Sequence, residues 1–149
     1  MSKKKYATLV IVILIFLFSG CTSRYPYSLA QDIDNIVQVE IREYDWETRT
    51  TTPLCVLDEE TAISLLAEIC GLPCKKHFGD HPTDYGDVVV YISYLDGTAE
   101  VLGQCNVAQV NKEGVWSIGI KYFDRKEFYT VLMKYVDADI LPDLSKYFY

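Results

Sequence analysis

The chain has 149 residues, a formal net charge of −7 and 50% hydrophobic residues. This length corresponds to one domain, and it suffices for a hydrophobic core without an obligatory metal or disulfide. The excess of acidic residues disfavours binding to nucleic acids and to anionic membrane surfaces, because both repel a negatively charged protein.

The first 21 residues have the pattern of a secretory signal. Three lysines at positions 3–5 precede an almost unbroken apolar run from Ala7 to Phe18. The run is shorter than the ~18 residues that indicate a membrane-spanning helix, so we expect it to be cleaved. Phe-Ser-Gly-Cys at positions 18–21 resembles the lipobox of bacterial lipoproteins, although Phe18 stands where leucine is usual. This resemblance implies that Cys21 is acylated and becomes the new N-terminus.

The signal divides the chain into four expected segments. Residues 1–20 form the signal peptide, residues 21–35 the lipid anchor and tether, residues 36–137 a single domain, and residues 138–149 a C-terminal extension. Loss of the three lysines changes the formal charge from −7 to −10. Attachment to the cytoplasmic membrane therefore depends on the lipid, and we expect the domain to lie outside the cytoplasm.

Alternating apolar and polar residues predict a strand from residue 36, with Val37, Val39 and Ile41 on its buried face. After a turn, residues 54–57 are expected to form a second, antiparallel strand.

A helix is predicted over about residues 59–70. Asp58 is a suitable N-cap, and apolar residues recur at helical spacing. Gly71 and Pro73 then favour its termination.

Asp-Gly at positions 96–97 is typical of a two-residue type I′ turn between antiparallel strands. Counting outward from this turn pairs Tyr94 with Ala99 and directs Cys105 toward the helices. The same register places Glu100 on the opposite face of the sheet.

A further strand over residues 116–122 and a helix from Asp124 to about Val136 complete the predicted elements. The order β-β-α-β-β-β-α predicts an α+β fold, in which both helices cover one face of an antiparallel sheet.

Five cysteines are present, of which Cys21 is assigned to the lipid. A disulfide between Cys105 and either Cys74 or Cys70 is compatible with the predicted register, and Cys74 to Cys105 is the pairing we favour. Buried free thiols are the alternative, since cysteine also packs as a small apolar residue.

Cys70, Cys74, His77 and His81 lie within twelve residues, and all four are of types that bind zinc or copper. The spacing lacks the long segment that separates ligand pairs in zinc fingers, and two lysines precede His77. A helix end followed by a polar loop is the simpler interpretation. A nucleophilic Cys74 with His77 as its base lacks a family-specific signature, so we do not expect an enzyme.

The 12 tyrosines and 2 tryptophans exceed the needs of a small core. Tyr44, Trp46 and Tyr85 fall in predicted turns or loops, where aromatic residues often contact ligands. The alternative is that they pack over the ends of the sheet.

Several motifs resemble those of small lipobox-bearing lipoproteins from Gram-positive, Firmicutes-type gut bacteria. They are Val-Glu-Ile-Arg-Glu-Tyr at 39–44, Leu-Pro-Cys at 72–74, Pro-Thr-Asp-Tyr-Gly-Asp at 82–87 and the hairpin that follows. The resemblance covers about residues 36–136. It implies a similar fold and an envelope location, and it supplies no catalytic residues.

The sequence thus predicts a membrane-anchored, non-enzymatic binding module without a cofactor. Its ligand would be a protein, a peptide or a cell-wall component. The alternative is a metal-binding or thiol-redox lipoprotein that uses Cys70, Cys74, His77 and His81.

Overall fold

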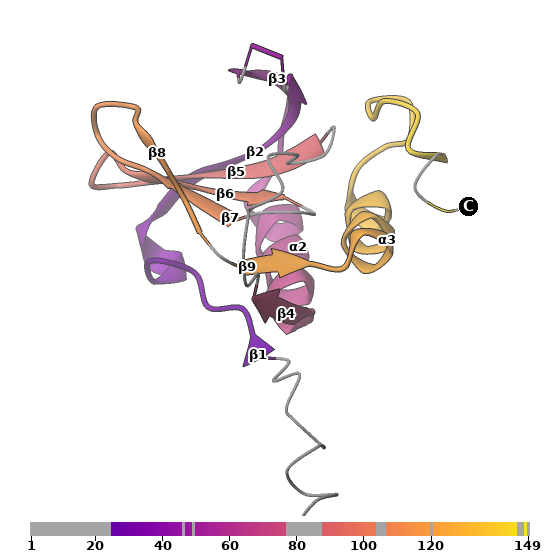
Figure 1. The fold of residues 1–149 in the computed structure, drawn as a ribbon, viewed down its shortest axis with the longest axis horizontal. Helices are drawn as coiled ribbons and strands as arrows, with labels where there is room; N and C mark the ends of the chain where they lie inside the picture. The colour runs from indigo at the N-terminus through magenta and orange to yellow at the C-terminus, as the bar shows by residue number, and fades with distance from the viewer. Residues whose placement is uncertain are drawn as a thin grey trace, which may run out of the picture.

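The computed structural model describes residues 25–45, 47–48, 50–76, 88–103, 107–119, 121–145 and 148. This part of the chain forms a six-stranded and a three-stranded antiparallel sheet with two α-helices (Figure 1). The predicted α+β fold class is therefore confirmed. Within these residues, no helix combines the length and the hydrophobicity needed to cross a membrane.

The larger sheet has the strand order β3-β2-β5-β6-β7-β8, and the smaller has the order β1-β4-β9. The strands of the larger sheet are β2 (Ile36–Asp45), β3 (Thr50–Val56), β5 (Val88–Tyr94), β6 (Ala99–Gly103), β7 (Val107–Val110) and β8 (Trp116–Ile118). Those of the smaller sheet are β1 (Tyr25–Pro26), β4 (Pro73–Lys76) and β9 (Lys121–Phe123). The helices are the 3₁₀ helix η1 (Ile33–Asn35) and the α-helices α2 (Glu59–Gly71) and α3 (Arg125–Tyr135).

The two α-helices begin where the sequence predicts. The Asp58 carboxylate accepts hydrogen bonds from the backbone N–H of Thr61 at 2.9 Å and from its hydroxyl at 2.8 Å. Asp124 caps α3 in the same manner. Each cap satisfies backbone donors that have no partner inside the helix.

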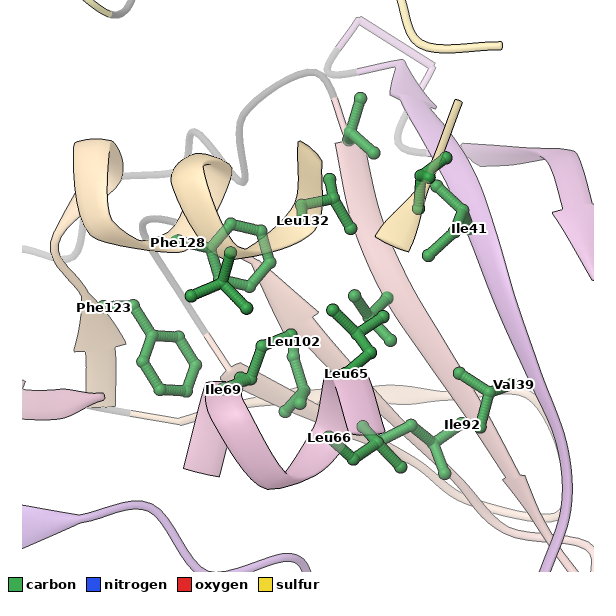
Figure 2. Close-up of a cluster of buried hydrophobic side chains, with 14 of the residues drawn as sticks. Val39, Ile41, Leu65, Leu66, Ile69, Ile92, Leu102, Phe123, Phe128 and Leu132 are labelled. Atoms are coloured by element: carbon green, nitrogen blue, oxygen red, sulfur yellow. The ribbon is translucent and has the colours of Figure 1, made fainter. Parts of the chain in front are cut away.

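Both α-helices pack against the same face of the larger sheet (Figure 2). Helix side chains in this core include Leu65, Leu66, Ile69, Phe128 and Leu132, and sheet side chains include Val39, Ile41, Ile92 and Leu102. A second, smaller cluster lies on the opposite face and includes Val89, Val101 and Ala108.

The predicted strand over residues 116–122 divides into β8 and β9, which belong to different sheets. Gly119 lies at the division, where its N–H donates to the Val107 carbonyl at 2.7 Å. A Cβ atom at this position would lie 2.8 Å from that carbonyl oxygen, so the chain can cross here only with glycine.

The predicted hairpin register is wrong by one residue. Ser93, and not Tyr94, pairs with Ala99. The loop contains three residues, because the Tyr94 N–H donates to the Thr98 carbonyl at 2.9 Å and Gly97 has φ +83°. The shift turns Glu100 toward the helices, so the argument that directed Cys105 to that face no longer holds. Cys105 itself lies outside the described residues.

Val37 also differs from its prediction, because it is 59% exposed. The register between β2 and β5 shifts between Ile36 and Gln38, which leaves Val37 as an extra, bulged residue. Ile36 packs against the core in its place.

The packed domain begins earlier and ends later than the sequence predicts. β1 pairs with β4, and Tyr27, expected in a tether, is buried and donates its N–H to the Cys70 carbonyl at 3.0 Å. At the other end, Leu144 is buried in the core. The predicted tether thus contributes a strand and core residues, and the C-terminal extension packs on the domain.

We expect Gly97→Ala to lower the free energy of unfolding by about 1–2 kcal/mol, because a side chain disfavours positive φ. The added Cβ would lie 3.8 Å from the nearest atom, so the cost comes from the backbone alone. Gly71→Ala is the control: it adds a Cβ at the end of α2 with no atom within 4 Å, and it should leave stability unchanged or slightly higher. Urea unfolding measures both, and equal effects would contradict the three-residue loop.

Candidate functional site

A groove of about 440 Å³ lies between the start of β2 and the first half of α2. The 3₁₀ helix η1 and Leu57 contribute to its walls. The residues that line it are Ile33, Asp34, Ile36, Val37, Gln38, Val39, Leu57, Glu59, Ala62, Ile63 and Leu66.

The floor of the groove contains an open strand edge. β5 pairs with β2 from Ile36 onward, whereas β3 pairs with it only from Glu40 onward. Leu57 extends this contact by one residue, since its N–H donates to the Val39 carbonyl at 3.0 Å. Among the described strands, none therefore borders residues 36–38 on the side away from β5.

Three exposed apolar side chains converge on the groove. Ile33 is 44% exposed, Val37 59% and Ile63 44%. Single exposed apolar residues are normal on protein surfaces, but several around one concave site mark a place where a partner can bury them. The bulge at Val37 is what turns one of these side chains outward.

The described residues that line the groove carry only negative charges. They include the carboxylates of Asp34 and Glu59 and no lysine, arginine or histidine. Asp58 and Glu60 are exposed next to Glu59 at the start of α2. A ligand of this groove must therefore tolerate or neutralise several carboxylates.

The wall formed by η1 depends on a buried acid, Glu100, which is 0% exposed. Its carboxylate accepts hydrogen bonds from the Tyr27 hydroxyl, from the Ala30 N–H at 3.0 Å and from the Tyr94 hydroxyl at 2.6 Å. Residues 27–31, which we call the strap, lead directly into η1. The side chain of Gln31 continues the attachment by donating to the Thr98 hydroxyl at 3.0 Å.

The tyrosines that contact Glu100 remain hydrogen-bond donors. Burial and then the hydrogen bond to Glu100 raise the pKa of both Tyr27 and Tyr94 well above its usual range. Each ionised hydroxyl would lie beside a carboxylate, which strongly disfavours that state. The strap is thus attached by protonated hydroxyls at every pH near neutrality.

The cysteines of the predicted metal or redox site lie close to this cluster. Burial, with a smaller effect from the Glu100 charge, raises the pKa of Cys70 to about 11. Burial also raises the pKa of the Cys74 thiol. Thiolates are the form that binds metals and attacks disulfides, so these surroundings oppose both activities.

His77 and His81 lie outside the described residues, so the four-residue metal site stays a prediction. Among the residues that the structure does describe, no three His, Cys, Asp or Glu side chains are grouped as metal ligands. The disulfide between Cys74 and Cys105 also stays a prediction, because Cys105 is not described.

The predicted aromatic ligand-binding residues do not form the groove. Tyr44 lies in strand β2 rather than in a turn, is buried, and packs with its ring centroid 6.1 Å from that of Trp116. This position agrees with the alternative that such residues pack over the sheet. Trp46 and Tyr85 lie outside the described residues, as does the lipidation residue Cys21.

On the face of the sheet opposite the helices, the described residues Tyr44 and Tyr91 contact neighbouring side chains. The Arg42 guanidinium carbon lies 3.8 Å from the ring centroid of Tyr91, and the same guanidinium forms an ion pair with Glu40. Tyr44 is buried beside them. Tyr44 and Tyr91 therefore pack against neighbouring side chains and do not form a flat surface for a ligand.

Sequence reasoning missed the groove and the acid that supports it. Glu100 lies in β6, where all five residues are buried. Its apolar neighbours in the sequence are the one local signal for a buried acid. Ile63 is adjacent to Ala62 and lies off the buried stripe of α2, so its exposure follows from the helix spacing. The bulge that exposes Val37 has no such signal.

Comparison with protein-family models, with curated proteins and with solved structures finds no match.

We expect the domain to lose stability above about pH 10, the ordinary pKa of tyrosine. Below that pH, Tyr27 and Tyr94 are protonated in both the folded and the unfolded chain. Above it, the unfolded chain releases their protons and the folded chain does not, so the free energy of unfolding falls as the pH rises. The loss is on the order of 1 kcal/mol per tyrosine one pH unit above 10.

Urea unfolding between about pH 9 and 11 measures this effect for the natural chain and for Tyr27→Phe and Tyr94→Phe separately. Each variant lacks one of the two hydroxyls, so its stability should change less over this pH range. The same slope in all three proteins would contradict the role assigned to these tyrosines.

Proposed function

We propose that the chain is a non-enzymatic binding module, held by a lipid on Cys21 to the outer face of the cytoplasmic membrane. The observation that carries this proposal is the groove beside the open edge of β2, where Ile33, Val37 and Ile63 expose apolar surface. Concave sites with exposed apolar side chains are the usual places where proteins bind ligands.

The reactive side chains of the described residues favour binding over catalysis. Glu100 is fully buried and accepts three hydrogen bonds, so it is not available to a substrate. The raised pKa values of Cys70 and Cys74 keep their thiols protonated and weakly nucleophilic. The groove itself contains the carboxylates of Asp34 and Glu59, which lie on separate elements, and apolar or amide side chains.

The lipid would hold this module close to the bilayer. β1 begins at Tyr25, four residues after Cys21, and Tyr27 is buried in the core. Four residues in an extended chain reach about 14 Å. The domain would therefore bind partners at the membrane surface and would not extend far into the cell wall.

Cys21→Ala should abolish incorporation of a labelled fatty acid, because the thiol is the acceptor of the first acyl chain. We expect the variant to keep its signal segment and the natural protein to lose it. Metabolic labelling followed by mass spectrometry of the N-terminal peptide measures both properties. Equal labelling of the two proteins would refute the anchor.

The groove is tested in intact cells by replacing single residues with the photo-crosslinking residue p-benzoylphenylalanine. We expect discrete adducts from positions Val37 and Ile63 of the lipid-anchored protein. Positions Leu95 and Met133 are matched controls, because they are 70% and 48% exposed and do not line the groove. Adducts that are equally strong at all four positions, or absent from the first two, would contradict a binding role for the groove.

A further inference from the structure

We propose that the groove binds an extended segment of a partner protein in which apolar residues alternate with lysine or arginine. The segment lies along the open edge of β2, places apolar side chains against Ile33, Val37 and Ile63, and places its cations near Asp34 and Glu59. This inference rests on the proposed binding function and adds the chemical class and the conformation of the ligand.

The shape of the groove favours an extended chain. Its floor is formed by residues 36–38 of β2. This part of the strand pairs with β5 on one side and has no paired strand among the described residues on the other. An extended peptide can form backbone hydrogen bonds with such an edge, and its successive side chains point to opposite sides. One side would face the apolar residues of α2 and η1, and the other would face solvent and the exposed carboxylates of Asp34 and Glu59.

The apolar contacts supply most of the expected binding energy. Ile33 lies on η1 and Ile63 lies on α2, and both line the groove beside β2. Val37 lies on β2 itself. All three are between 44% and 59% exposed, so a bound side chain can remove apolar surface from water on more than one wall.

The charge determines which peptide is accepted. Every charged residue in the described part of the groove's lining is acidic, and Asp58 and Glu60 add carboxylates beside it. Lysine and arginine residues of a peptide would be attracted, and aspartate or glutamate would be repelled at close range. An anionic lipid headgroup would be repelled for the same reason.

The lining also argues against a carbohydrate ligand. Sugar rings are commonly bound on the faces of Trp and Tyr, whose rings supply large apolar surfaces. None of the eleven described residues that line the groove is aromatic. The aromatic residues Tyr44 and Tyr91 on the outer face of the sheet are occupied by neighbouring side chains.

Two blocked peptides test the proposal: acetyl-Lys-Val-Lys-Val-Lys-amide and its counterpart with glutamate at every lysine position. Binding is followed by NMR shifts of the isoleucine and valine methyl groups in the domain. We expect the basic peptide to shift Ile33, Val37 and Ile63 and to bind at least tenfold more tightly than the acidic one. Methylation of its central amide nitrogen should weaken binding, because strand pairing needs that donor.

Matched variants separate the groove from general attraction to an acidic protein. Asp34→Asn with Glu59→Gln should weaken binding of the basic peptide at least fivefold, whereas Glu113→Gln, an exposed acid outside the groove, should not. Val37→Lys should abolish binding, and Met133→Lys should leave it within twofold. Equal losses in the groove and control variants, or equal affinity for both peptides, would overturn the proposal.

The outcomes also separate this inference from the proposed function. Adducts from positions 37 and 63 in cells, with no binding of the basic peptide, would leave a binding module whose ligand is not a basic strand. Absence of both results would overturn the two proposals together.

Discussion

The structure depends on the burial of one carboxylate. A buried, unpaired acid costs several kcal/mol, so Glu100 is tolerated only where donors surround it. Those donors come from Tyr27, Ala30 and Tyr94, and the first two lie about 70 residues away in the chain. Satisfying Glu100 therefore requires the strap to be in place. Because η1 follows the strap directly, the same hydrogen bonds position one wall of the groove.

Local signals in the sequence were sufficient for the two α-helices and the fold class, but not for the strands of the smaller sheet. The Asp58 cap predicted the start of α2, and the alternation of Val39 and Ile41 predicted the buried face of β2. The errors in which face a strand residue occupies came from two shifts of one residue, at Gly97 and at Val37. Asp-Gly is compatible with loops of two or three residues, and a single-residue shift exchanges the faces of a strand. One shift brought Glu100 into the core, and the other brought Val37 into solvent.

The candidate site was not predictable because its parts have no shared pattern in the sequence. The residues that looked chemically active, Cys70 and Cys74, lie where burial raises the pKa of their thiols, and the Glu100 charge adds to this effect at Cys70. Tyr44 lies in a strand under neighbouring side chains. The groove instead combines ordinary apolar and acidic residues from η1, β2 and α2, and these meet only in the folded domain.

A lipid on Cys21 would give the acidic groove a particular physical setting. The domain would lie within about 14 Å of an anionic surface, because β1 begins only four residues after Cys21. Headgroups and groove would then attract the same basic segments, and the bilayer would raise the local concentration of such a partner while competing for it. The apolar side chains at Ile33, Val37 and Ile63 distinguish the two, since headgroup charge alone offers no surface in which valine or isoleucine can be buried. Selectivity for the groove over the membrane would thus come from apolar contacts and strand pairing, whereas the carboxylates would favour basic over acidic segments and speed the encounter.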